Sequence, residues 1–187
     1  MNRVRTWEKL KYFNPKNILI ELREIENKYP LKEMPYSVSS LRTRSLKQHG
    51  QSRQCALFCY GMSQAFNITM KYADSEDSDY DFISYIEEHK LFVPIQMKEF
   101  VPEKVNSKTE LEIEIAKLGK YVDSSDLCVA MYVNRVSSID FSRLKIPDLN
   151  IGELWFFGAG DPFQSTWKLI GNVLEQTEVY TFEYPKA

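Results

Sequence analysis

The stretch from Ser78 to Phe100 constrains the fold more than any other part of this chain of 187 residues. Its two halves are rich in Phe, Ile, Tyr and Val, and the polar tip Glu87-Glu88-His89-Lys90 joins them. This pattern predicts two antiparallel β-strands in a hairpin. If the turn is centred on Glu88 and His89, residues whose numbers sum to 177 lie opposite each other in the two strands.

This register places polar side chains together on one face of the hairpin. Asp81 lies opposite Gln96, and Asp79 lies opposite Lys98. Because side chains alternate between the two faces of a strand, the other face receives Tyr80, Phe82, Met97 and Glu99. The polar face is either an ordinary solvated surface with a weak Asp79–Lys98 ion pair, or a divalent-metal site. Mg²⁺ binds carboxylate, amide and carbonyl oxygens and keeps several waters.

The spacing of Asp81, fourteen further residues and then Gln96-Met97-Lys98 resembles the signature of the PD-(D/E)xK nuclease superfamily, in its Gln-x-Lys variant. The resemblance implies that Asp81, Gln96 and the backbone carbonyl of Met97 bind Mg²⁺ or Mn²⁺. It also implies that Asp81, Gln96 and Lys98 form the catalytic site, with Lys98 as the catalytic lysine. A lysine beside such an ion orients a metal-activated water and stabilises charge developing on a phosphate.

The elements expected around the hairpin follow the order of that superfamily. Hydrophobic periodicity and turn residues predict a helix over residues 39–66, interrupted at His49-Gly50, a strand over 67–73, a helix over 107–122 and a buried strand over 127–133. The resemblance therefore predicts an α/β fold with a restriction-endonuclease-like core, α-β-β-β-α-β, with a mixed sheet. The glutamate that the first helix of the family often carries is missing, and only Gln54 and Gln64 have suitable length there. Asp74, Glu76 or Asp77 is a candidate for the missing carboxylate.

The chain is expected to form one domain over residues 1–187. Residues 1–36 are a helical extension with helices over 6–13 and 15–29, the second capped by Asn14. Residues 37–134 form the core, and 135–187 form a C-terminal β extension with strands over 153–158, 166–174 and 179–184. The extension is rich in aromatic residues, which suit a core, a homodimer surface or base stacking: Trp155, Phe156, Phe157, Phe163 and Trp167.

Charge is unevenly distributed along the chain. Residues 1–54 hold 12 of the 24 Lys and Arg but 5 of the 26 Asp and Glu, giving +7 against −9 for the remainder. This basic third is either a DNA-binding surface or a solvated helical face. Lys117 and Tyr121 lie four residues apart and resemble the Gln-x-x-x-Tyr box of RecB-like nucleases, with Lys in place of Gln. The candidate nucleic-acid contacts are Arg42, Arg44, Lys47, Arg53, Lys117 and Tyr121.

The remaining features exclude some environments and leave three functions open. Cys55 and Cys59 are expected to be buried thiols on one helix face. No apolar run approaches about 18 residues and no signal-peptide core is present, so we expect a cytoplasmic protein without a membrane span.

The expected function is metal-dependent endonucleolytic cleavage of DNA. The alternatives are a non-catalytic protein of the same fold that binds nucleic acid or a protein, and an interaction protein such as a toxin antagonist.

Overall fold

Seven β-strands form one mixed sheet in which each strand lies beside its neighbour in sequence, from β1 to β7. The computed structural model describes residues 3–29, 33–77, 79–136, 138–141 and 143–186. The helices are α1 (Arg3–Trp7), α2 (Pro15–Lys28), α3 (Tyr36–Ser39), α4 (Lys47–Phe66) and α5 (Leu111–Ala116), and a 3₁₀-helix follows at Lys117–Lys120. The strands are β1 (Met70–Asp74), β2 (Phe82–Ile86), β3 (Leu91–Phe100), β4 (Ser124–Val133), β5 (Ile151–Ala159), β6 (Thr166–Gly171) and β7 (Glu178–Glu183).

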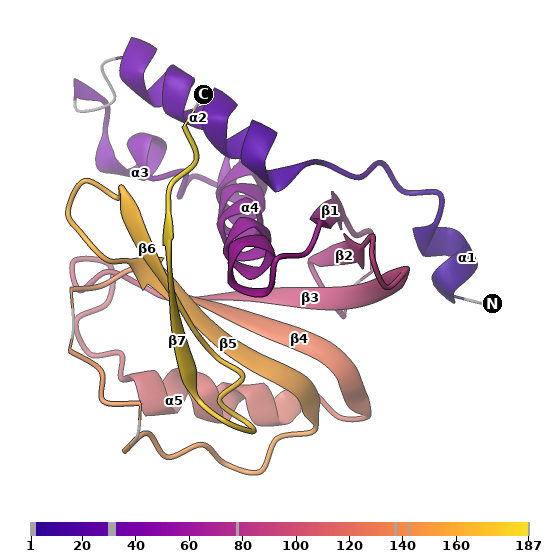
Figure 1. The fold of residues 1–187 in the computed structure, drawn as a ribbon. Helices are drawn as coiled ribbons and strands as arrows, with labels where there is room; N and C mark the ends of the chain where they lie inside the picture. Colours follow the sequence, from indigo (N-terminus) through magenta and orange to yellow (C-terminus); the bar gives the residue numbers. More distant parts are fainter. Residues whose placement is uncertain (1–2, 30–32, 78, 137, 142, 187) are drawn as a thin grey trace.

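The sheet changes direction twice across its width. Strands β1, β2 and β3 are antiparallel, β3, β4 and β5 are parallel, and β5, β6 and β7 are antiparallel again. Parallel neighbours need a crossover connection, and α5 supplies the one between β3 and β4. The sheet curls around α4, while α5 covers its opposite face (Figure 1). The expected order of helix, strand, strand, strand, helix, strand is confirmed from α4 to β4.

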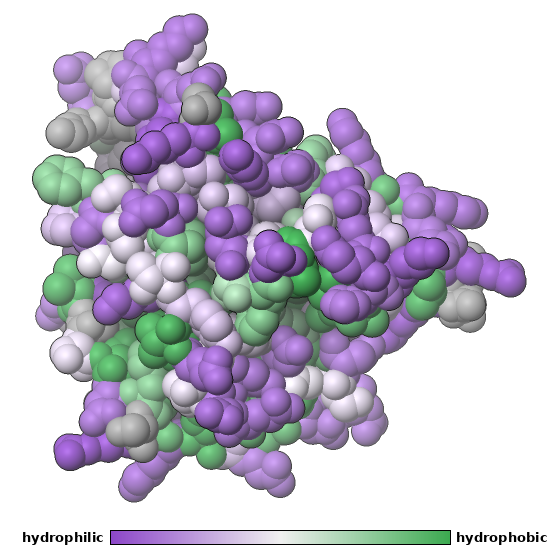
Figure 2. Space-filling view, viewed as in Figure 1, coloured by the Kyte–Doolittle hydropathy of each residue, from purple (hydrophilic) through white to green (hydrophobic). Residues whose placement is uncertain are grey.

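Two hydrophobic clusters hold the helices to the two faces of the sheet. On the concave face, Leu57 and Phe58 of α4 pack with Phe157 and Trp167, and all four are fully buried. On the other face, α5 contributes Ile115 to a second cluster. Cys55 and Cys59 are buried free thiols, as predicted. Hydrophilic side chains cover much of the visible surface of α2, at the top of the view, and of the N-terminal segment, at the right (Figure 2).

The hairpin forms with the predicted register. Phe82 pairs with Ile95 and Ile86 with Leu91, so the paired numbers sum to 177. The first strand begins at Phe82, however, and its predicted start at Ser78 lies outside the described residues. The predicted strand pairing of Asp79 with Lys98 is therefore wrong. Tyr80 leaves the face of Phe82 and accepts a hydrogen bond from Trp7 Nε1 at 3.1 Å, within the cluster on the α5 side.

The helix predicted over residues 39–66 is divided, but not at His49-Gly50. Helix α3 ends at Ser39, and α4 begins at Lys47 and runs through His49 and Gly50. Between them Leu41 adopts a φ of 56°, which a helix excludes. A Cβ on Gly50 would lie 3.3 Å from the Leu41 Cβ, so the connection folds closely against α4 at a glycine.

The ends of the other elements combine confirmed and corrected predictions. Asn14 caps α2 and accepts a hydrogen bond from the Lys16 N–H at 2.9 Å, as predicted. The helix predicted over 6–13 is wrong, because α1 spans Arg3–Trp7 and Phe13 forms a bridge with Tyr72. The helix predicted over 107–122 is shorter, with α5 ending at Ala116 and a 3₁₀ turn following it.

The three predicted C-terminal strands are confirmed as β5, β6 and β7. Four of the five aromatic residues singled out there are buried, namely Trp155, Phe156, Phe157 and Trp167. They therefore build the core, and only Phe163 lies at the surface. None of the described helices is both long and apolar enough to cross a bilayer.

Close packing between α4 and β7 predicts a strong effect of substitution at Gly61. A Cβ there would lie 2.6 Å from Phe182 Cε1, and the Phe182 side chain is buried. We expect Gly61→Val to lower the free energy of unfolding by about 1–3 kcal/mol, because the buried ring cannot move without disturbing the core. Gly119→Ala is the control, since a Cβ there meets no atom within 4 Å. Equal urea midpoints for the two variants would contradict this packing.

Candidate functional site

A cleft of about 1090 Å³ opens where the start of α4 faces strand β3. The connection before α4, the C-terminal part of α2 and the loop after β5 complete its walls. All four residues of the predicted catalytic and metal site line this one cleft: Asp81, Gln96, Met97 and Lys98. The hairpin register thus brings distant parts of the sequence motif to a common surface.

Asp81 lies where the ladder between β2 and β3 ends. Its backbone N–H donates to the Ile95 carbonyl at 3.0 Å, which continues the ladder by one residue. Its carboxylate Oδ2 then accepts the Met97 backbone N–H at 2.9 Å. The side chain of Asp81 therefore replaces the next backbone acceptor, and its position is fixed by the strand that carries the rest of the motif.

The side-chain amide of Gln96 joins the carboxylate to the Met97 carbonyl. Its Nε2 donates to Asp81 Oδ2, and the same nitrogen lies 3.3 Å from the Met97 carbonyl oxygen. Since both partners are acceptors, the nitrogen rather than the oxygen of the amide faces them. Asp81 Oδ2 and the Met97 carbonyl oxygen therefore both face the Nε2 atom of Gln96.

The charges of three lysines act on the pKa of the Asp81 carboxyl group. Burial raises the pKa of Asp81, whereas the Met97 N–H and the charges of Lys98, Lys47 and Lys120 lower it, leaving it above its ordinary value. Burial and the charge of Lys47 lower the pKa of Lys98, and Asp81 opposes this change. The ion pairs of the described residues do not include one between Asp81 and Lys98.

An aromatic ring closes the lysine side of this cluster. Lys98 Nζ lies 5.6 Å from the ring centroid of Tyr121, and Lys120 Nζ lies 5.1 Å from the same centroid. Burial raises the pKa of the Tyr121 hydroxyl, so Tyr121 stays a neutral phenol beside these amines. Sequence reasoning identified Tyr121 but missed Lys120, because the 3₁₀ turn that carries Lys120 was expected to be α-helical.

Two of the predicted nucleic-acid contacts, Arg42 and Arg53, are bound to other side chains of the protein. Arg42 forms an ion pair with Glu99, which also accepts a hydrogen bond from Asn134 at 2.7 Å. Arg53 lies 3.3 Å from Glu26 and donates to Gln164 Oε1 at 3.0 Å. Both guanidinium groups therefore hold the walls of the cleft together.

The other candidates are more accessible. Arg44 and Lys47 are exposed, the first in the connection before α4 and the second at its start. Lys117 is turned toward Glu114, with an Nζ–Oε1 distance of 2.6 Å. The 3₁₀ geometry separates Lys117 from Tyr121, so the two do not share the predicted helix face.

The donor set at Asp81 suits a weakly held hard cation. The described residues contain no group of three or more His, Cys, Asp and Glu able to hold a metal. Among the described residues that line the cleft, none is one of the proposed extra carboxylates Asp74, Glu76 and Asp77. Asp81 and the Met97 carbonyl nevertheless converge, and Mg²⁺ needs only one or two carboxylates when it retains its waters. The residues therefore fit Mg²⁺ if the Gln96 amide rotates to present its oxygen.

Comparisons with models of protein families, with curated proteins and with solved structures find no match to this chain. The functional argument therefore rests on the geometry of the cleft.

The lysine cluster predicts how the carboxyl group of Asp81 titrates. Lys98 lowers the pKa of Asp81, so Lys98→Met removes a favourable charge and raises that pKa further above its ordinary value. Carboxyl ¹³C NMR titration of the wild type and the variant measures this change. Lys117→Met is the control, because its amine pairs with Glu114, and an equal effect of both variants would contradict the arrangement.

Proposed function

We propose that this protein is a divergent member of the PD-(D/E)xK nucleases that hydrolyses phosphodiester bonds of DNA with a divalent metal at Asp81. The observation that carries the proposal is the convergence of Asp81, Gln96, Met97 and Lys98 on one open cleft. A short motif has many accidental matches in sequences. A motif whose residues meet at a surface large enough for a phosphate has fewer.

The arrangement of the elements also supports this proposal. Three antiparallel strands follow α4, and α5 then leads to β4, which is parallel to β3. A restriction-endonuclease-like core has this order of elements. Here Asp81 precedes β2, and Lys98 lies within β3.

In the proposed reaction each residue has a separate task. Asp81, the Met97 carbonyl and a rotated Gln96 amide would hold Mg²⁺ or Mn²⁺, which supplies Lewis-acid activation of water and of the phosphate. Lys98 lines the same cleft, and its lowered pKa makes its amine easier to deprotonate, so that it can receive a proton from water. As an ammonium, the same group stabilises negative charge on the phosphate. Lys47 and Arg44 attract the DNA backbone.

A second candidate function is binding of nucleic acid or a protein partner without cleavage. It is favoured by the single carboxylate at the centre and by the Gln96 nitrogen, which lies where a cation would contact Asp81 and Met97. Three lysine charges that act on Asp81 also suit a phosphate better than a cation. Both candidate functions use the same cleft, and they differ in whether a phosphodiester bond of the bound nucleic acid is cleaved.

The nuclease proposal includes two expectations about context. It places the protein in the cytoplasm, where it would meet DNA. Nucleases that cut both strands often act as pairs, so the proposal includes a homodimer. The aromatic residues of β5 are buried, and so is Trp167 on β6. A homodimer would therefore form through other surfaces.

Cleavage assays test the proposal directly. We expect the wild type to nick or linearise circular DNA with Mg²⁺ or Mn²⁺, and Asp81→Ala and Lys98→Ala each to lower the rate about 100-fold or more. Matched controls are Asp126→Ala and Lys108→Ala, which remove an exposed acid and an exposed amine outside the cleft. Equal activity of all variants would exclude this centre. Salt-dependent DNA binding without cleavage would establish the second candidate.

The exposed basic residues predict a salt-dependent contribution to binding. Replacing Arg44 and Lys47 with Gln removes charges that are free to release counterions from DNA. We expect the slope of log K against log salt concentration to fall by about 2 for the double variant. Fluorescence anisotropy over a salt series measures the slope. Lys9→Gln with Lys108→Gln is the control pair of exposed cations, and an equal change in that pair would contradict the assignment.

A further inference from the structure

Phe163 is the most exposed of the described aromatic residues that line the cleft, ahead of Tyr29 and Tyr36. It lies in the loop between β5 and β6 and is 83% exposed. It lines the cleft that contains Asp81 and Lys98, and also a neighbouring pocket of about 340 Å³ beside α2. The other aromatic residues singled out in this region are buried. The hydrophobic core therefore does not explain the position of Phe163.

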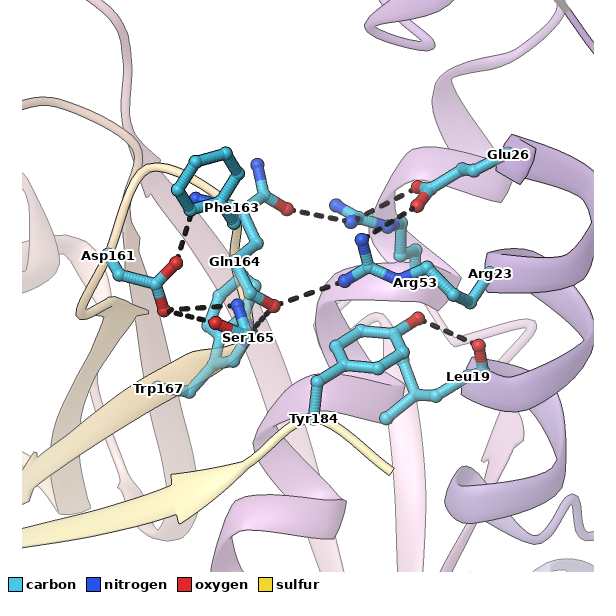
Figure 3. A network of polar contacts seen from close by, with 10 residues as sticks. All are labelled: Leu19, Arg23, Glu26, Arg53, Asp161, Phe163, Gln164, Ser165, Trp167 and Tyr184. Atoms are coloured by element: carbon cyan, nitrogen blue, oxygen red, sulfur yellow. Dashed lines mark hydrogen bonds and ion pairs between the residues drawn. The ribbon is translucent and has the colours of Figure 1, made fainter. Parts of the chain in front are cut away.

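The loop that carries Phe163 is held by one carboxylate. Asp161 accepts the backbone N–H of Phe163 at 2.7 Å and that of Ser165 at 3.1 Å (Figure 3). It also accepts the backbone N–H of Thr166 at 2.6 Å. These bonds lower the pKa of Asp161, with the Thr166 N–H as the largest cause, so the carboxylate is ionised at neutral pH. The backbone around Phe163 is thus fixed from within the loop.

A second set of contacts anchors the loop to the helices. The Gln164 carbonyl accepts from Arg23 Nη2 at 3.1 Å and from Trp167 Nε1 at 3.0 Å. The Gln164 side chain accepts from Arg53 at 3.0 Å. In Figure 3 the ring of Phe163 makes none of the drawn bonds. The backbone that carries the ring is therefore held in place, which reduces the entropy lost when a ligand orders this loop.

The charges around the ring indicate what kind of ligand reaches it. Arg23 and Arg53 are engaged with Glu26 and Gln164, so they do not provide free charge beside Phe163. The amines of the same cleft belong to Lys47, which is exposed, and to Lys98, which is half-buried. A ligand that uses both parts of the cleft carries a negative group and a flat apolar group. A nucleotide within a single strand has both.

We infer that Phe163 stacks on an unpaired base of a nucleic-acid strand whose backbone lies along the cleft. The inference rests on the proposed function and specifies its substrate as single-stranded or locally unpaired. In a duplex, neighbouring bases cover both faces of each base, whereas an unpaired base offers a face to an aromatic ring. Phe163 is a binding residue in this proposal and takes no part in the chemical step.

The test measures binding without metal. A fluorescein-labelled single-stranded DNA containing 2-aminopurine is titrated in EDTA with the wild type, Phe163→Ala and Phe163→Trp. We expect Phe163→Ala to weaken binding about tenfold and to abolish the quenching of 2-aminopurine, and Phe163→Trp to restore both. A duplex of the same sequence is expected to bind equally to all three. Val179→Ala removes another exposed apolar side chain, on β7, and serves as the control.

The outcomes separate this inference from the proposed function. If the wild type binds DNA and cleaves it while Phe163→Ala binds the single strand equally well, only the role of Phe163 is wrong. If Phe163→Ala loses single-stranded and duplex binding to the same extent, base stacking is wrong. If the wild type binds neither DNA in EDTA and cleaves none with Mg²⁺ or Mn²⁺, both proposals are wrong. If it cleaves DNA with metal but binds no single strand in EDTA, only the inference about Phe163 is wrong. Unchanged thermal unfolding of the variants shows that the fold is intact.

Discussion

Burial of helix α4 inside the curl of the sheet is the constraint on which the other features depend. The apolar run from Cys55 to Met62 is buried on nearly every side of the helix, whereas a flat sheet covers only one side of a helix. The curl brings β7 and the loop after β5 toward α2, where Tyr184 donates to the Leu19 carbonyl at 2.7 Å. The cleft forms between the helices and the inner edge of this curl. Its existence follows from hydrophobic packing, whereas its chemistry follows from the residues at its edge.

Asp81 serves the fold and the proposed activity at once. It satisfies the Met97 N–H where the backbone ladder ends, and burial makes its charge less stable than that of an exposed carboxylate. Nearby lysines offset part of this destabilisation. A group that is buried, charged and close to several amines is typical of functional sites, although structural networks also contain such groups. The open cleft beside Asp81 favours the functional interpretation.

The sequence predicted those elements that depend on local patterns. Alternating β-formers and a polar tip were sufficient for the register of β2 and β3, and the aromatic segments were sufficient for β5 to β7. The start of α4 was missed because Leu41 takes a left-handed conformation that depends on its packing against Gly50. Lys120 was missed because the expected α-helix has 3.6 residues per turn, whereas the 3₁₀ turn that forms at Lys117–Lys120 has three and directs its side chains differently. The atom that Gln96 presents to Asp81 depends on tertiary neighbours, which spacing in the sequence does not specify.

The contact between Tyr184 and Leu19 joins residues that are 165 positions apart. The loop that carries Phe163 likewise completes its anchoring on residues of α2 and α4. During synthesis on the ribosome, the helices and the hairpin emerge long before the strands that close the curl. The opposite wall of the cleft therefore forms only after these strands have emerged, and the binding surface becomes complete when the last strand docks.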